Sequence, residues 1–150
     1  MIYVDTNVLL SIFCPDALTE AAFLWYRKAD APVALSTWTA TEFRANIGIR
    51  VRRTDLSRAA GLAAMHRFDA AIVANMRVLA PSAEHFDIAN EWLANPDCAL
   101  RSGDALHLAI ATERRCSQLV TFDRSFGSAA RKLKLPVVVL KPSANLTARR

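Results

Sequence analysis

The chain has 150 residues, 53% of them hydrophobic, which is enough for one domain with a full core but too short for two. Its 19 lysines and arginines against 14 acidic residues give a net charge of +5, so the mean field attracts anions such as nucleic acid or an acidic partner. No apolar run approaches the roughly 18 residues of a membrane span, and the N-terminus lacks the basic segment of a signal peptide.

The first half of the sequence alternates short apolar runs with helical patterns. Residues 2–5 (IYVD) and 32–36 (PVALS) predict buried strands, and a short helical stretch follows the first of them up to Cys14. Helical spacing of apolar residues predicts further helices over 17–29, 39–53 and 55–76. The last of these carries a stripe that faces the core or a second copy of the chain, formed by Leu56, Ala60, Ala63, Phe68, Ile72 and Met76.

The second half continues the same alternation. Ser82 and Asn95-Pro96 bound one predicted helix, and another starts on Ser102. A strand over 118–123, a short helix over 125–134 and a strand over 136–140 complete the order. Apolar strands separated by helices are typical of a parallel sheet covered on both faces, so the predicted fold class is α/β.

The whole chain, residues 1–150, is expected to form this single domain, with residues 141–150 as a frayed tail. The three cysteines form no CxxC pair and no even set, which is typical of reduced thiols in a cytosolic protein. We therefore expect a cytoplasmic location and no membrane association.

Four acidic residues are expected at one edge of the predicted sheet. Asp5 and Asp123 end strands, whereas Glu42 and Asp104 lie in the first turns of helices. In a parallel α/β sheet the carboxyl ends of strands and the amino ends of helices share the edge where ligands bind. Each acid taken alone also has a structural explanation. Glu42 fits a capping box with Thr39, Asp104 complements a helix dipole, and the other two fit caps or turns.

The four acids together predict a metal site. Two carboxylates about 4 Å apart repel by roughly 4 kcal/mol at an effective dielectric of 20, so such a cluster needs a cation. Oxygen ligands without histidine or cysteine favour Mg²⁺ or Mn²⁺ over zinc. A divalent ion of this kind activates water for attack on a phosphodiester.

Four segments resemble the PIN-domain nucleases, and the length and segment order are similar to VapC-type toxins of bacterial toxin-antitoxin pairs. The segments are MIYVDTNVLL, TATEF, SGDALHLAIA and LVTFDRSF. The resemblance runs from Met1 to about Leu140 and implies a PIN-like three-layer α/β/α sandwich with a central parallel sheet of four to five strands. The acidic quartet of the family falls on Asp5, Glu42, Asp104 and Asp123, with none substituted.

The resemblance also implies a function. It predicts a Mg²⁺- or Mn²⁺-dependent endoribonuclease that cleaves tRNA or rRNA, with Asp5 and Asp104 as direct metal ligands and Glu42 and Asp123 completing the metal and water shell. It further implies a homodimer that is silenced by a small VapB-type antitoxin.

Other polar residues near the quartet suggest supporting roles. Thr6 and Asn7 either orient the attacking water or only start a helix. His107 is either a general base or a buried supporting residue. The arginines that follow Glu42 either bind phosphates beside the cut site or form an ordinary solvated face; they are Arg44, Arg50, Arg52, Arg53 and Arg58.

Two other functions stay open at this point. One is an inactive PIN-fold module that only binds RNA or a protein partner. The other is a phosphatase of the haloacid dehalogenase type, which would use Asp5 as its nucleophile, but Asn7 stands where the second acid of its DxD motif belongs. Glycine-rich nucleotide-binding motifs and a GxSxG serine elbow are absent from the sequence.

Overall fold

The computed structural model describes residues 1–142. Its strands are β1 (Ile2–Val4), β2 (Val33–Ser36), β3 (Arg77–Leu79), β4 (Gln118–Thr121) and β5 (Val137–Val139). Its helices are α1 (Thr6–Phe13), α2 (Thr19–Lys28), α3 (Thr37–Arg52), α4 (Arg58–Asn75), α5 (Ala83–Leu93), α6 (Ser102–Glu113) and α7 (Arg124–Lys132). The tail predicted to be frayed covers residues 141–150, and its part beyond Pro142 lies outside the described residues.

The five strands form one parallel sheet in the order β3-β2-β1-β4-β5. In the register of the central strands, Tyr3 lies opposite Ala34 on β2 and opposite Leu119 on β4. From β1 the chain adds β2 and then β3 on one side of the sheet, and afterwards β4 and β5 on the other side of β1. The strand order therefore reverses between β1 and β4. Such a switch point is where open α/β sheets bind ligands, at the carboxyl ends of the strands.

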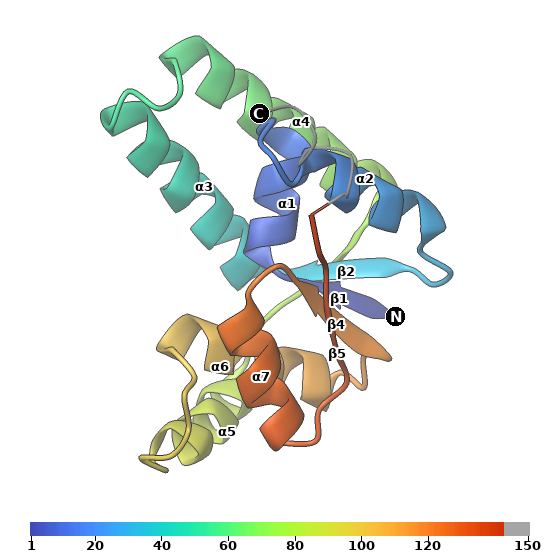
Figure 1. Cartoon of the computed structure of the whole chain (residues 1–150), viewed down its shortest axis with the longest axis vertical. Helices are drawn as coiled ribbons and strands as arrows, with labels where there is room; N and C mark the ends of the chain where they lie inside the picture. Colours follow the sequence, from blue (N-terminus) through green and yellow to red (C-terminus); the bar gives the residue numbers. More distant parts are fainter. Residues whose placement is uncertain (143–150) are drawn as a thin grey trace.

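Helices cover both faces of the sheet (Figure 1), and the predicted three-layer α/β/α fold is confirmed. Alternate residues of β1 point to opposite faces. Ile2 and Val4 join a core with helices α1 to α4, whereas Tyr3 joins a second core with α5, α6 and α7. All residues of β1 and β2 are buried, which explains why their sequences show no polar alternation.

Strand β3 was not among the strands predicted from the sequence. It has three residues, lies at the edge of the sheet, and two of its residues, Arg77 and Val78, are exposed. A short exposed edge strand carries neither an apolar run nor a polar alternation. Its pairing with β2, Leu35 opposite Val78, decides its conformation.

The stripe predicted on α4 faces the core only in part, and its contact with a second copy of the chain, the other alternative, stays a prediction. Phe68 is buried as expected, but Ala60 and Ala63 are exposed, and the residues buried against the core are Gly61, Ala64 and Phe68. Small residues occur on every side of this helix, so its apolar pattern does not identify one buried face. The contact with α3 decides which face is buried.

Two further properties agree with the composition. Within residues 1–142, no helix has both the length and the hydropathy of a membrane-crossing segment. The three cysteines are free thiols, with Cys14 and Cys116 buried and Cys98 half-buried.

Gly127 tests the packing of α7 against β5. A Cβ atom at this position would lie 2.1 Å from Cγ2 of Val139, which is a severe overlap with a half-buried branched side chain of β5. We expect Gly127→Ala to lower the free energy of unfolding by about 1–3 kcal/mol, the usual cost of overpacking. Urea denaturation followed by circular dichroism would measure this change.

Gly48→Ala is the matched control, because Gly48 lies inside α3 and a Cβ there would meet only the flexible end of Arg52, at 3.2 Å. This variant is expected to gain about 0.5–1 kcal/mol from helix propensity. Equal stability of Gly127→Ala and the wild-type protein would contradict the described α7–β5 packing.

Candidate active site at the carboxyl edge of the sheet

An acidic cleft of about 250 Å³ lies at the switch point between β1 and β4. All four acids predicted from the sequence line it: Asp5, Glu42, Asp104 and Asp123. Its other polar lining residues are Thr6, Asn7, Asn46, Arg101 and His107. The four acids come from four separate segments, and the sheet topology brings them together.

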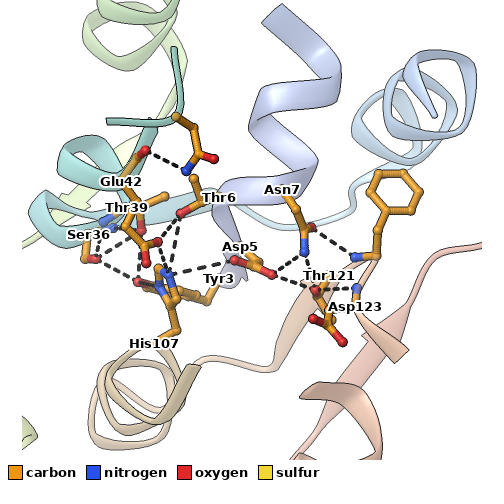
Figure 2. Close-up of polar contacts among 12 residues, drawn as sticks. Tyr3, Asp5, Thr6, Asn7, Ser36, Thr39, Glu42, His107, Thr121 and Asp123 are labelled. Carbon is orange, nitrogen blue, oxygen red and sulfur yellow. Dashed lines mark hydrogen bonds and ion pairs between the residues drawn. The ribbon is translucent and has the colours of Figure 1, made fainter. Parts of the chain in front are cut away.

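Asp5 follows β1 directly and is almost fully buried, with 6% of its surface exposed. Its Oδ2 accepts hydrogen bonds from Asn7 Nδ2 at 2.7 Å and from Thr121 Oγ1 at 2.6 Å (Figure 2). Asn7 Oδ1 in turn accepts from the backbone N–H of Phe122 at 3.0 Å. Burial raises the pKa of Asp5, although His107 and the Thr121 hydrogen bond oppose that rise. Oδ1 of Asp5 is thereby the oxygen left for the cleft.

Glu42 lies in the cleft because other residues cap α3. The predicted capping box between Thr39 and Glu42 was wrong: α3 begins two residues earlier, and Ser36 is its N-cap with Thr39 as the box partner. Glu42 Oε2 instead accepts from Thr6 Oγ1 at 2.5 Å and lies 2.7 Å from His107 Nε2. Burial would raise the pKa of Glu42, but these bonds outweigh it and lower the pKa.

His107 is a buried cation among these acids. The Tyr3 hydroxyl donates to Ser36 Oγ at 2.7 Å, so its oxygen accepts from His107 Nδ1 at 2.9 Å. Nε2 faces Glu42 at 2.7 Å and Asp5 Oδ1 at 3.7 Å (Figure 2). Both ring nitrogens therefore donate, which requires the imidazolium form. Burial opposes this charge, but Tyr3, Glu42 and Asp5 outweigh it and raise the pKa of His107 to about 10.

Asp104 and Asp123 complete the negative side of the cleft. Asp123 caps α7 with Oδ1, which accepts from the backbone N–H groups of Ser125 at 2.7 Å and Phe126 at 3.0 Å. The capping role predicted for Asp123 and its position in the cleft are therefore compatible. Burial, followed by the charges of Asp5 and Asp123, raises the pKa of Asp104 to about 6. Negative charge at this edge is thus only partly balanced.

The donor chemistry of the cleft fits a hard divalent cation. Within residues 1–142, no lysine or arginine forms an ion pair with any of the four acids, and His107 is their cationic partner. Oxygen donors that raise one another's pKa are the kind of set that Mg²⁺ or Mn²⁺ binds. The same part of the chain contains no three His, Cys, Asp or Glu side chains already arranged as metal ligands.

Several contacts in the cleft were not foreseen from the sequence. Thr6 and Asn7 were expected to orient water or only to start a helix, but their side chains hold Glu42 and Asp5. Tyr3 and Thr121 were not singled out, because a hydroxyl inside an apolar strand has no distinctive pattern. Arg101 also lines the cleft, and its place just before the SGD segment is the only signal that the sequence offers.

The arginines of α3 lie elsewhere. Arg44 is paired with Asp69 on α4 at 2.5 Å, and Arg53 with Asp55 at 3.4 Å. Arg50 is eight residues beyond Glu42 on the same helix, roughly 12 Å along its axis. None of the five predicted arginines lines the acidic cleft.

The fold and the cleft define an α/β protein with an acidic cleft at the switch point of a parallel sheet. The model of the PIN domain family matches residues 2–132. The chain therefore belongs to the PIN domain family. None of the curated proteins compared with the sequence matches it.

Solved structures agree with this assignment. VapC20 of Mycobacterium tuberculosis, described as a sarcin-ricin loop cleaving toxin, is 25% identical with a TM-score of 0.68, covering 86% of this chain and 95% of its own. FitAcB of Neisseria gonorrhoeae is 20% identical with a TM-score of 0.72, covering 91% and 96%. VapBC2 of Rickettsia felis, bound to a promoter DNA fragment, is 17% identical with a TM-score of 0.66, covering 94% and 100%. At 20% and 17% identity, FitAcB and VapBC2 show a similarity of fold alone.

Replacement of His107 tests the charge balance of the cleft. His107→Gln keeps a side-chain donor but removes the positive charge between two carboxylates. We expect the free energy of unfolding to fall by about 3 kcal/mol at pH 6, the lower end of the range for breaking a buried pair. Because the folded pKa of about 10 lies above the unfolded value of 6.5, this contribution is complete below pH 6.5 and disappears as pH rises through 10.

Urea denaturation of metal-free protein between pH 6 and 10 would measure the difference. His66→Gln serves as the control, because His66 is exposed on α4 and its loss should leave stability unchanged. A deficit of His107→Gln that stayed constant, or grew, toward pH 10 would show that the ring is neutral in the folded protein.

Proposed function

We propose that this chain is a divalent-metal-dependent endoribonuclease that acts as the toxin of a toxin-antitoxin pair. The observation that carries the proposal is the cleft lined by four carboxylates at the switch point of a PIN-domain sheet. The similarity to VapC20, which is described as a toxin that cleaves the sarcin-ricin loop, supports RNA as the substrate class. Either tRNA or rRNA fits this proposal.

The residues proposed to hold Mg²⁺ or Mn²⁺ are Asp5 and Asp104, with Glu42 and Asp123 completing the metal and water shell. A hard dication held there would supply charge neutralisation at the phosphoryl group and would lower the pKa of the attacking water. Oδ1 of Asp5 and Oδ2 of Asp123 make no hydrogen bond in the described residues and are the oxygens available for this role.

The remaining residues of the cleft position these carboxylates. Asn7 and Thr121 fix the plane of the Asp5 carboxylate. Thr6 and His107 fix Glu42 in the same way. His107 is not a general base in this proposal, because both of its nitrogens donate hydrogen bonds and neither has a free lone pair. Arg101, at the rim, is placed to contact a phosphate of the substrate.

A small inhibitory partner belongs to the same proposal. Several similar structures are described as toxin-antitoxin complexes or VapBC assemblies, such as those from Klebsiella pneumoniae and Haemophilus influenzae. A VapB-type antitoxin that covers the acidic cleft would silence the nuclease, and a homodimer is the expected assembly. Relief of toxicity by coexpression of a neighbouring small reading frame would test the partner.

The isosteric variants Asp5→Asn and Asp104→Asn test the catalytic proposal. Each removes one negative charge from the cleft without changing side-chain size. We expect each to lower the rate of RNA cleavage by at least about 100-fold, because loss of even an outer partner of a metal ligand costs 10- to 100-fold. Sequencing of new RNA 5′ ends, together with growth curves of expressing cells, would measure both effects.

Asp30→Asn is the control, since Asp30 is exposed and lies outside the cleft, and it should cleave RNA at the wild-type rate. Cleavage that persisted at the wild-type rate in both cleft variants would show that these carboxylates do not catalyse it, whereas growth arrest without new RNA 5′ ends in the wild type would support an inactive binding module. Hydrolysis of p-nitrophenyl phosphate that is lost in Asp5→Asn would instead support the phosphatase.

Metal binding is expected to depend on pH. Asp104, with a pKa of about 6, must lose its proton before it can bind a cation. The affinity for Mn²⁺ should therefore rise with pH and level off above pH 7, falling up to about 10-fold per pH unit below 6. Isothermal titration calorimetry of wild type and Asp30→Asn at pH 5, 6 and 7 would show this slope, and Asp104→Asn should bind far more weakly. Absence of Mn²⁺ uptake by wild type at pH 7 would refute the metal site.

A further inference from the structure

A second cavity lies beside the acidic cleft, between α5, α6 and the first turn of α3. It has a volume of about 140 Å³, which is room for one flat ring system and small compared with typical ligand pockets. Its lining is uncharged and includes Trp38, Phe86, Ala89, Asn90, Leu93 and Gly103. A neutral and largely apolar group therefore fits this space better than a phosphate or a cation.

Two aromatic residues and one amide give the cavity its chemistry. Phe86 is 50% exposed on the surface of α5 and lines the cavity, so one face of its ring is accessible to a ligand. Asn90 lies one turn further along α5, and its exposed amide makes no hydrogen bond within the described residues. Nε1 of Trp38 is buried beside Gly103, and its N–H is directed toward the Glu42 carboxylate, whose pKa it helps to lower.

The cavity and the acidic cleft share one thin wall. Trp38 and Glu42 lie one turn apart on the same face of α3, with Trp38 lining the cavity and Glu42 the cleft. Gly103 separates them: a Cβ there would lie 2.9 Å from Glu42 Oε1 and 3.8 Å from Trp38 Nε1. The next residue, Asp104, lines the cleft. A ligand that has a phosphate in the cleft can therefore extend past Gly103 into the cavity.

We propose that this cavity binds the nucleobase of a ribonucleotide next to the phosphodiester held in the cleft. The inference rests on the proposed nuclease function and adds a base-binding subsite to it. Unstacked bases of single-stranded RNA are recognised by stacking on aromatic side chains and by hydrogen bonds to their edges. Phe86 provides the stacking surface, the Asn90 amide can bond the base edge, and the Trp38 ring forms part of the wall.

Nucleoside 5′-monophosphates test the subsite directly, because they contain no phosphodiester and cannot be cut. AMP, GMP, CMP and UMP are titrated into the wild-type protein with Mg²⁺, with ribose 5-phosphate as the probe that lacks a base. The indole N–H resonance of Trp38, assigned by Trp38→Phe, reports occupancy by NMR. We expect at least one nucleotide to shift this resonance, and ribose 5-phosphate to leave it unmoved.

Substitution of Phe86 separates stacking from phosphate binding. Phe86→Ala should weaken the binding of that nucleotide by about 5- to 150-fold, the usual effect of losing one base–aromatic stack. Phe23→Ala is the matched control, because Phe23 is an equally exposed aromatic, 44%, on α2, and its loss should change nothing. Asn90→Ala should reduce the difference in affinity among the four nucleotides.

The subsite is refuted if all four nucleotides bind no better than ribose 5-phosphate, or if Phe86→Ala behaves like Phe23→Ala. An RNA cleavage assay on the same proteins separates the two proposals. Cleavage without any Trp38 shift would remove the base subsite and leave the nuclease standing. Nucleotide binding at Trp38 without cleavage would remove the nuclease and leave a nucleotide-binding site.

Discussion

The charge of His107 is the interaction on which the candidate site depends. A buried imidazolium is costly, and it persists here because Glu42 lies 2.7 Å from one ring nitrogen and Tyr3 accepts from the other. The same ion pair fixes the direction of the Glu42 carboxylate. Within residues 1–142, Asp104 forms no ion pair, although Arg101 lines the same cleft. The imbalance of charge that would attract a dication is therefore a consequence of where this one histidine is placed.

In two carboxylates of the site, one oxygen accepts hydrogen bonds that support the fold and the other oxygen is left for the cleft. Asp5 gives Oδ2 to Asn7 and Thr121, and Asp123 gives Oδ1 to the first turn of α7. Each keeps one oxygen that accepts no hydrogen bond within the described residues, and for Asp5 this oxygen lies 3.7 Å from His107 Nε2. Capping and ligand binding are thus not alternatives for an acid at this edge, because a carboxylate has two oxygens and about four acceptor sites.

Much of the fold followed from local patterns in the sequence. Four of the five strands lie in the short apolar runs predicted as strands, and three helices, α3, α4 and α5, directly follow a capping serine. The errors occurred where several residues were chemically equivalent. Both Ser36 and Thr39 can cap α3. Only the position at which the chain leaves β2 decides between them. On α4, alanines occur on every side of the helix, so several faces look alike. Strand β3 at the sheet edge has no buried face that would produce an apolar pattern in its sequence.

The sequence by itself determined the order of the helices and of every strand except β3, and the placement of four acids at one edge of the sheet, because both depend on periodicity and on parallel topology. Only the tertiary structure decided which oxygens are free, that His107 is charged, and that Trp38 and Phe86 line a cavity beside Glu42. These properties arise from contacts between residues up to 116 positions apart, such as Asp5 and Thr121. Their energies depend on local burial and distance, which no pattern of neighbours along the chain encodes.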